Sequence, residues 1–323
     1  MSSAPLKNVA VAGASGSLGS VVFKKLVDSG LFDKVTALRR PGSGSGAAAP
    51  AGNAKVQVVD VDVDFSSVDA LTAALQGHDA VIALFGATSL GLQTALIDAS
   101  IRAGVQRFLP SEFGSDLQNP HNRTLLPFLQ KVEVETYLEK KARECPSFSY
   151  TFVYNGAFLD WGLEHDFLLD VSEGGEPTIF DGGDLPFNAT TLDTVASGVV
   201  GVLAHAVAET RNRAVYIGDF KTTQNELLAA AQRVMAAAGK GKGKEEKEKA
   251  AWRVRHTSLR DAVAAADERL AQGIVDLQTI APYLYRSLFD PAHGGDFQRN
   301  DNALLGVQPK SKSVIEEILR RKL

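Results

Sequence analysis

The chain has 323 residues, 45% of them hydrophobic and 22% charged, and its formal net charge is −4. This composition is typical of a globular protein and excludes a disordered or fibrous chain. The slightly acidic balance gives no basic surface for nucleic acid.

The first half of the chain alternates between short apolar runs and segments with helical spacing. Strands are predicted at 9–12, 35–38, 56–63, 80–85, 107–109 and 149–154. Helices are predicted at 19–29, 68–75, 91–103 and 125–144. Apolar strands that alternate with helices indicate a parallel sheet covered on both faces. The expected fold class is therefore α/β, a Rossmann-type doubly wound parallel sheet.

The alternation weakens in the second half. Gly, Pro and Asp cluster between Gly174 and Pro186, which predicts a loop region. Further elements are predicted at 192–208, 214–217, 224–238 and 313–322, the second of them a strand and the others helices. We expect residues 1–155 to form the Rossmann domain, with 190–222 packing back on it, and 156–323 to form a smaller, interleaved α/β cap. Two segments, 42–52 and 239–249, have the composition of solvated insertions.

A glycine-rich turn joins the first strand to the first helix. Glycine lets a phosphate approach the backbone, and the helix N-terminus adds partial positive charge. This strand–turn–helix context predicts a dinucleotide site, although a tight turn can be purely structural. The spacing is G-x-x-G-x-x-G, and the residues expected at the phosphates are Gly13, Ser15, Gly16, Ser17, Leu18 and Gly19.

The second strand ends in Leu38-Arg39-Arg40, where a site for NAD usually carries Asp or Glu. Arginine offers forked donors that suit a 2′-phosphate. Arg39 and Arg40 therefore predict a preference for NADP(H), although arginines at a strand end can be surface charge alone.

The segment Phe108-Leu109-Pro110-Ser111-Glu112-Phe113-Gly114 closely resembles the fifth-strand motif of isoflavone reductase-like enzymes, in the NmrA-like group of atypical short-chain dehydrogenases. The glycine turn, Arg39, the helix around Gln93 and the strand 150–153 match in the same order, and 155–161 is more similar to fungal members than to plant ones. The resemblance implies NADPH-dependent reduction of an aromatic or phenolic secondary metabolite, such as an enone, a benzylic ether or a quinone. The further cofactor-binding residues that it implies are Phe85, Gln93, Ser111, Glu112, Phe113, Lys131, Asn155, Gly156 and Phe158.

The resemblance also implies one catalytic lysine early in the helix after the fifth strand, which is the position of Lys131. A lysine partly desolvated beside nicotinamide has a lowered pKa and can exchange a proton with substrate. The alternative is a solvated lysine paired with Glu135 one turn further on.

A competing motif lies on the same predicted helix. Tyr137 and Lys141 form Tyr-x-x-x-Lys, the acid pair of ordinary short-chain dehydrogenases, and would make the protein a carbonyl reductase. At ~100° per residue, Tyr137 lies about 120° around the helix from Lys131, so the two cannot both face one nicotinamide. Packing is the simpler interpretation of Tyr137. A third hypothesis is an NADP(H)-sensing regulator without turnover, but such proteins tend to lack the lysine.

Aromatic residues near strand ends are candidates for binding a flat substrate, because ligands bind at the carboxyl edge of such sheets. Core packing explains any single one equally well, and a lone histidine is more often structural. The substrate-binding candidates are Phe113, Tyr154, Phe158, Trp161 and His165.

The remaining features restrict partners and location. A single cysteine, Cys145, excludes an internal disulfide, and the histidines lack metal-ligand spacing, so no metal is expected. No apolar run reaches the ~20 residues of a membrane span, and the first residues lack signal-peptide features. We expect a cytoplasmic monomer or homodimer whose partner is a small aromatic substrate, not nucleic acid or membrane.

Overall fold

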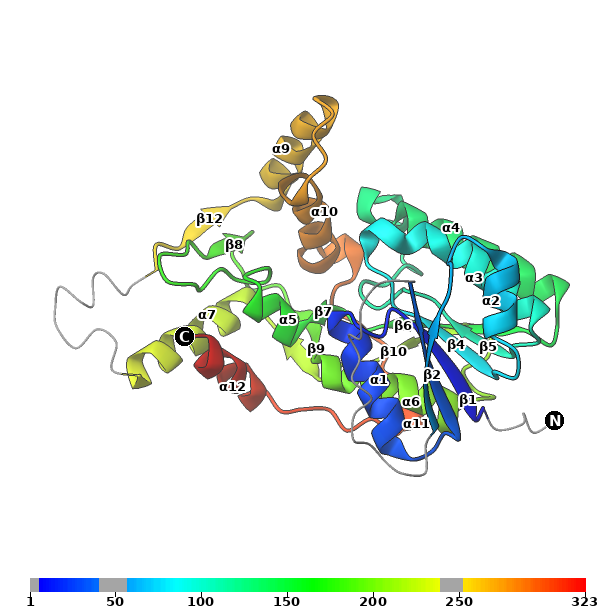
Figure 1. The fold of residues 1–323 in the computed structure, drawn as a ribbon. Coiled ribbons are helices and arrows are strands. Elements are labelled where there is room, and N and C mark those ends of the chain that lie inside the picture. Colours follow the sequence, from blue (N-terminus) through cyan, green and yellow to red (C-terminus); the bar gives the residue numbers. More distant parts are fainter. Residues whose placement is uncertain (1–5, 41–56, 239–251) are drawn as a thin grey trace.

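The computed structural model describes residues 6–40, 57–238 and 252–323. The two expected insertions, 42–52 and 239–249, lie outside the described residues. In the described part of the chain, seven strands form one sheet in the order β10-β6-β5-β4-β1-β2-β3, and all paired strands are parallel (Figure 1). The strands are β1 (Asn8–Ala12), β2 (Lys34–Arg39), β3 (Gln57–Asp62), β4 (Ala80–Ala83), β5 (Arg107–Leu109), β6 (Ser149–Tyr154) and β10 (Arg213–Tyr216).

The strand order reverses between β1 and β4. The chain builds outward from β1 through β2 to β3 and then returns to place β4 on the other side of β1. β4 is buried along its whole length, and β1 from Val9 to Ala12, because each is a short run of valine, alanine and isoleucine between two neighbours. Ligands of open α/β sheets bind at the carboxyl edge of such a reversal.

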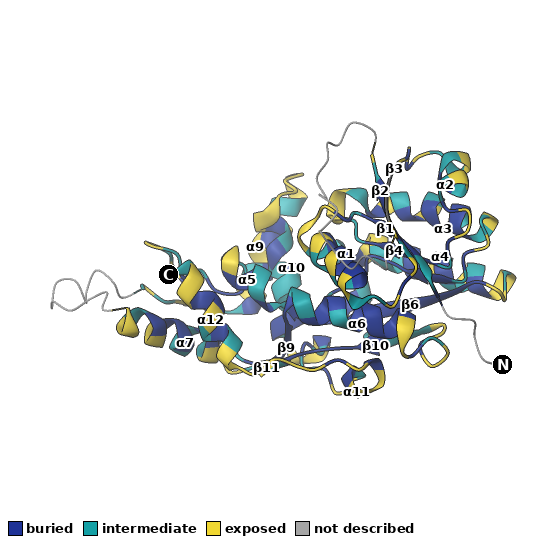
Figure 2. Ribbon diagram, turned by 60° about the horizontal axis from the view of Figure 1, so that its bottom comes forward, coloured by how far each residue is buried: buried dark blue, intermediate teal, exposed yellow. Residues whose placement is uncertain are grey.

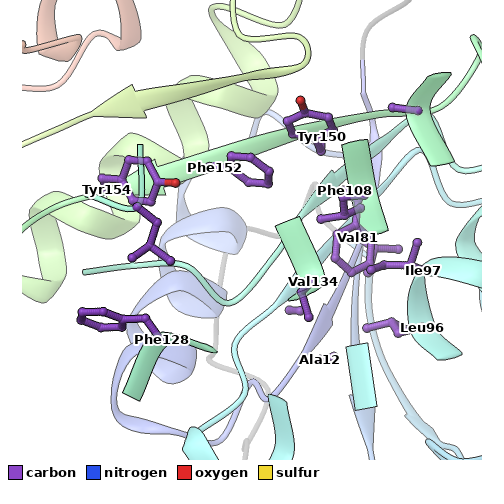
Figure 3. Packing of buried hydrophobic residues seen from close by; sticks show 14 of the residues in the cluster. Ala12, Val81, Leu96, Ile97, Phe108, Phe128, Val134, Tyr150, Phe152 and Tyr154 are labelled. Atoms are coloured by element: carbon purple, nitrogen blue, oxygen red, sulfur yellow. The ribbon is translucent and has the colours of Figure 1, made fainter. Parts of the chain in front are cut away.

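Helices cover both faces of the sheet, which confirms the doubly wound prediction. α1 (Ser17–Ser29) and α6 (Leu192–Ala204) pack together on one face. α2 (Val68–Ala74), α3 (Gln93–Arg102) and α4 (Leu129–Glu144) lie on the other (Figures 1 and 2). On that second face Val81 and Phe108 from the strands meet Ile97 from α3 (Figure 3).

Two helices begin later than the sequence predicts. α4 starts at Leu129 rather than 125, after the 3₁₀ turns Asn122–Thr124 and Leu126–Phe128. Leu125 is extended, with ψ 134°, and Pro127 follows in the second turn, so the α-helix cannot form earlier. α3 likewise begins at Gln93, after a 3₁₀ helix over Ala87–Leu92.

The second half adds two small sheets and a third core cluster. β7 (Ala157–Phe158), β9 (Phe187–Thr190) and β11 (Phe220–Thr222) form one sheet, and β8 (Thr178–Phe180) pairs with β12 (Arg255–Thr257) in the other. β8 falls inside the segment predicted as loop, where its partner strand supplies hydrogen bonds from far along the chain. The helices of this half are α5 (Leu159–Glu164), α7 (Gln224–Ala237), α9 (Leu259–Ala271), α10 (Leu277–Phe289), α11 (Asn302–Leu305) and α12 (Ser313–Lys322).

The chain crosses between the two halves more than once. α6 and β10 follow β9 in sequence but belong to the layers of the large sheet, and β11 then returns to the small one. α9 and α10 pack against each other and project beyond the sheet edge (Figure 1). Among the described residues, every helix is too short or too polar to span a bilayer.

Candidate active site

The glycine turn is shaped by two contacts that no side chain would allow. A Cβ at Gly13 would lie 2.3 Å from the backbone oxygen of Leu84, and Gly13 has φ +89°. A Cβ at Gly19 would lie 2.0 Å from the oxygen of Gly13. At Gly16 the nearest atom would be 3.5 Å away, an ordinary contact. Gly13 and Gly19 are therefore required by packing, whereas Gly16 keeps the outer face of the turn open.

The start of α1 offers free backbone donors beside this open face. Gly16 is the N-cap, has no side chain to cap the helix, and no acidic residue lies in the first turn. Ser15 and Ser17 are exposed, and Leu18 is half-buried. A helix terminus of this kind carries partial positive charge and unsatisfied N–H groups. The turn therefore fits a pyrophosphate.

Arg39 and Arg40 lie at the same edge of the sheet. Arg39 is the last residue of β2, and its side chain is 19% exposed, with Nε 3.7 Å from Asp62 Oδ1 at the end of β3. Arg40 is exposed. Both residues lie at the carboxyl end of β2, the strand next to β1 and its glycine turn, where a 2′-phosphate would lie if the pyrophosphate sits on α1.

Three of the implied cofactor residues hold loops in place. Gln93 is fully buried, and its Oε1 accepts a 2.8 Å hydrogen bond from the Ser111 backbone N–H. Ser111 Oγ accepts a 2.9 Å bond from the backbone N–H of Phe85. These bonds tie the exit of β5 to the exit of β4, so Gln93 and Ser111 shape this edge from beneath. Phe85 itself is half-buried.

Lys131 reaches the point where the exits of β5 and β6 meet. Its Nζ donates to the backbone oxygen of Glu112 and lies 4.0 Å from the position of a Cβ at Gly114. The backbone N–H groups of Asn155 and Gly156 both donate to the Gly114 oxygen, at 3.1 and 2.9 Å. Lys131 itself is half-buried. Lys131 therefore stands at the carboxyl edge of the sheet, next to the segments that the resemblance implied.

The backbone at this junction is tightly packed. Gly156 has φ +66°, and a Cβ there would lie 2.4 Å from the Asn188 oxygen. Asn155 is fully buried and donates through Nδ2 to the Gly156 oxygen, while its Oδ1 has no partner among the described residues. Asn155 Oδ1 is therefore a buried acceptor that is left unpaired between β6 and β7.

Glu135, one turn after Lys131, is fully buried and does not form the solvated ion pair with Lys131 that was the alternative interpretation. It belongs instead to a cluster with Arg123 and Tyr154. Arg123 Nη1 lies 2.5 Å from Glu135 Oε2, and the Tyr154 hydroxyl donates to Glu135 Oε1. Gln118 Nε2 donates to the same hydroxyl at 3.2 Å. No motif in the sequence marks Arg123 or Glu135, because the cluster joins three separate elements.

The pKa values in this region are shifted by burial. Burial lowers the pKa of Lys131, although the charges of Glu112 and Glu135 act in the opposite direction. Burial also raises the pKa of Glu112 to about 8, opposed by Lys131 and Arg123. The pKa values of this amine and this carboxyl group are thus shifted toward each other.

Tyr137 and Lys141 lie elsewhere on α4. The Tyr137 hydroxyl donates to Asp98 Oδ1 on α3 at 2.6 Å, and Lys141 Nζ is 3.2 Å from the same oxygen. Burial and the contact with Asp98 raise the pKa of Tyr137. This pair joins α3 to α4 and is poorly suited to donate a proton, which favours the packing interpretation.

The five substrate-binding candidates differ in how deeply they are buried. Tyr154 is fully buried, and Phe113 is 7% exposed. Phe158 and Trp161 are half-buried, and His165 is exposed and stacked on Trp161 with ring centroids 4.7 Å apart. Phe158 and Trp161 can contact a ligand, whereas Tyr154 and Phe113 support the site from below.

Sequence reasoning missed the aromatic row that continues from Trp161. Phe167 lies 5.9 Å from Trp161, and Tyr285 of α10 lies 5.0 Å from Phe167, measured between ring centroids. No element was predicted from the sequence over Leu277–Phe289, so this wall of the cap was not anticipated. Among the described residues, no group of three or more His, Cys, Asp or Glu is arranged to hold a metal ion.

The chain is similar to known proteins in both sequence and fold. The family model of the NmrA-like family matches residues 5–235. Oxidoreductase poxI of Penicillium oxalicum is 29% identical over 269 residues, covering 79% of this chain and 78% of the relative. Oxidoreductase aprR of Aspergillus flavus is 29% identical over 319 residues, covering 97% and 98%. A solved structure described as AtPrR2 with NADP+ and (+)pinoresinol covers 100% of both chains with a TM-score of 0.71 at 19% identity, which is a likeness of fold.

Proposed function

Because the chain belongs to the NmrA-like family, we propose that it is an NADPH-dependent oxidoreductase that reduces a phenolic or other conjugated aromatic metabolite. The observation that carries this proposal is Lys131, a half-buried amine with a lowered pKa at the carboxyl edge of the sheet. Relatives of similar length named as oxidoreductases support the same reaction class.

The proposed cofactor site uses the glycine turn and the end of β2. Backbone N–H groups of Ser17 and Leu18, in the first turn of α1, would hold the pyrophosphate, and Arg39 would hold the 2′-phosphate. A neighbour of the same fold is described with NADP+, which supports this choice of cofactor. When bound, the reduced nicotinamide supplies the hydride.

Lys131 would act as the general acid or base that exchanges a proton with the substrate. As the ammonium it gives a proton to a substrate oxygen that gains charge during hydride transfer, and as the amine it accepts one from a phenol. The lowered pKa brings the two forms closer in population near neutral pH, which suits either role.

The substrate would lie against the cap. Phe158 and Trp161 offer half-buried aromatic faces, and a flat substrate can stack on such rings. The same neighbour is described with (+)pinoresinol, an aromatic compound, which supports the class of substrate. We further propose that residues 1–155, with 190–222, hold the cofactor and that 156–323 hold the substrate.

The test compares Lys131→Met with Tyr137→Phe. The first variant should bind NADPH normally and lose turnover by about 10²–10⁴-fold, the usual contribution of a general acid or base. The second removes a hydroxyl that joins α3 to α4 and should leave turnover nearly unchanged. NADPH oxidation is followed at about 340 nm, the absorbance of the reduced cofactor, over a panel of enones, benzylic ethers and quinones.

The other hypotheses predict different results. A carbonyl reductase that uses Tyr137 and Lys141 would lose activity in Tyr137→Phe and keep it in Lys131→Met. A regulator would bind NADPH and show no turnover with any compound of the panel. Either result would contradict the proposed mechanism.

A further inference from the structure

Helix α4 carries Lys131 in its first turn, and this turn has few contacts that hold it in place. Phe128, the N-cap residue, makes no side-chain hydrogen bond, and no acidic residue lies in the first turn. The first two residues of the helix, Leu129 and Gln130, are exposed. The first N–H groups of a helix have no partner within it, and helix ends fray unless other contacts hold them. A defined place for Lys131 therefore requires contacts further along the helix.

Glu135 makes such contacts one turn after Lys131. Residues four apart lie on the same side of a helix, one above the other. Glu135 is fully buried, with Arg123 Nη1 2.5 Å from its Oε2, and the Tyr154 hydroxyl donates to its Oε1. Each oxygen of the carboxylate is thus bonded to a different element of the fold.

The two partners of this carboxylate are themselves held in place. Arg123 Nη1 also donates to the Leu117 oxygen at 3.0 Å. The residue before it, Asn122, is fully buried, and its Nδ2 donates a 2.9 Å bond to the oxygen of His293, which follows α10. Tyr154 is fully buried at the end of β6. The carboxylate is therefore bonded to a loop that is fixed on the cap and to a strand of the large sheet.

The same loop and strand lead to the segments that meet at Lys131. Lys131 Nζ donates to the backbone oxygen of Glu112, at the exit of β5. The exit of β6 is joined to this segment, because the Asn155 N–H donates a 3.1 Å bond to the Gly114 oxygen. The partners of Glu135 come from these two exits. Its hydrogen bonds thus relate the helix to the segments that Lys131 contacts.

The use of a charged residue at this position favours a role in geometry over a role in stability. A buried ion pair adds little stability, because the desolvation of two charges offsets most of their attraction. Apolar side chains fill a core at less cost, but a core packed by them alone loses a unique arrangement before it loses stability. Hydrogen bonds are directional, so two bonds to different elements fix both the height and the rotation of a helix.

We propose that Glu135 is a positioning residue for Lys131, and that Arg123 and Tyr154 act through it to fix the first turns of α4 over the exits of β5 and β6. The proposal rests on the proposed function and deepens it, because it names the groups that set the place of the proton donor. A displacement of about 1 Å at a reacting group costs about 10²-fold in rate. Loss of these contacts should therefore lower turnover without removing any group that touches the substrate.

The test compares Tyr154→Phe with Tyr137→Phe, its matched control. Each variant removes one phenol hydroxyl that donates to a carboxylate and ties α4 to a neighbouring element. Only the first tie acts on the helix one turn from Lys131. Tyr154→Phe should lower kcat by about 10- to 100-fold, with KM and the Kd for NADPH little changed. Tyr137→Phe should keep the wild-type kcat.

A double variant separates positioning from a general structural effect. A residue that acts only through Lys131 has no further effect once Lys131 is replaced. Lys131→Met with Tyr154→Phe should therefore turn over as slowly as Lys131→Met alone. An equal fold-loss of kcat from Tyr154→Phe in both backgrounds would overturn the proposal, and so would a wild-type kcat in Tyr154→Phe alone.

Arg123 reaches the same carboxylate from the other side and gives a second pair of variants. Its side chain is 32% exposed, so its replacement disturbs the core less than a change at Glu135 would. Arg123→Gln should lower kcat as Tyr154→Phe does, and Arg123→Lys, which keeps a cation for Glu135, should lose less. Equal losses in the two Arg123 variants would contradict a role through the carboxylate.

Labelling of the Lys131 amine gives a readout that needs no turnover. Trace acetic anhydride is applied to cofactor-free protein at one fixed pH, and mass spectrometry measures the modified fraction of Lys131. Tyr154→Phe keeps the charges of Arg123 and Glu135, so a change in rate reports the place of the amine. Lys131 should react about two- to tenfold faster in Tyr154→Phe, as expected when the amine loses one hydrogen bond, and at the wild-type rate in Tyr137→Phe.

The two readouts keep the proposal distinct from the proposed function. Equal labelling of Lys131 in wild type and Tyr154→Phe would overturn the positioning role, even in an active reductase. A wild type that reduces no compound would refute the proposed function, and the labelling rates would still decide whether the cluster fixes Lys131.

Discussion

At the scale of a single residue, Arg39 carries the expected choice between the two nicotinamide cofactors. Its guanidinium lies at the end of β2, with Nε 3.7 Å from Asp62. A 2′-phosphate would add two negative charges beside it, and a charge-assisted contact of this kind contributes about 1.5–3 kcal/mol. Arg39→Ala should therefore weaken NADPH binding by about ten- to a hundredfold and leave NADH binding nearly unchanged. Calorimetric titration with both cofactors measures the difference.

Arg40→Ala is the matched control, because Arg40 is the next residue and is exposed. We expect it to change NADPH binding less than Arg39→Ala does. Equal affinities of wild type for NADPH and NADH would remove the 2′-phosphate role from both arginines.

At the scale of an element, the seven residues of the glycine turn have two roles: Gly13 and Gly19 are required by packing, and Gly16 is expected to face the cofactor. Gly16→Val adds a side chain on the open face and should weaken NADPH binding strongly while thermal stability changes little. Gly19→Val places a Cβ about where the Gly13 oxygen lies, at 2.0 Å, so it should lower the melting temperature itself. Circular dichroism and NADPH titration of both variants test this contrast. A Gly16→Val protein that binds NADPH normally would reduce the turn to a structural role.

Local patterns made the large sheet predictable. The buried strands β1 and β4 are continuous apolar runs, and the close approach of Gly19 to the Gly13 oxygen is a contact within one turn of the chain. The cap was harder to predict, because its elements depend on contacts between distant parts of the chain. β8 pairs with β12 from a distant part of the chain, and no local signal encodes that partner.

The helical hairpin of the cap was not predicted, and the two helices differ in what obscures them. α9 is rich in alanine and buries only Leu259, Val263 and Ala266, so its apolar stripe is narrow. α10 contains Pro282, which argues against a helix in a sequence read by itself.

The residues of the site also fall into two groups, those that the sequence indicates and those that only the fold brings together. The sequence motif and the family resemblance indicated Lys131 and Glu112, but the cluster of Arg123, Glu135 and Tyr154 joins three elements that only the fold brings together. Its members carry no common spacing. Such a cluster is visible once helix α4 is placed over the ends of β5 and β6.

At the scale of the whole molecule, Arg107 ties the large sheet to the segment that returns from the cap. It lies on β5 and is 2% exposed. Its guanidinium donates to Ser149 and Thr151 on β6 and to Thr210 and the Val207 oxygen, which lie between α6 and β10. No carboxylate among the described residues pairs with it, and burial lowers its pKa to about 10. The cation is therefore held by neutral groups alone.

Arg107→Met should lower the free energy of unfolding by about 2–4 kcal/mol, because each buried group left without its partner costs about 1–3 kcal/mol. Arg102→Met is the control. Arg102 is 59% exposed and pairs with Asp69 on the surface, so its loss should cost about 0–1 kcal/mol. Denaturant unfolding followed by circular dichroism measures both.

The same experiment tests whether the interleaved halves unfold together. The two tryptophans, Trp161 and Trp252, both lie in the second half, while Arg107 lies in the first. Because α6 and β10 cross between the halves, loss of Arg107 should shift the tryptophan fluorescence transition as far as the circular dichroism transition. If the fluorescence midpoint stayed at its wild-type value, the cap would be an independent unit, and the crossing of α6 and β10 would not couple the two halves.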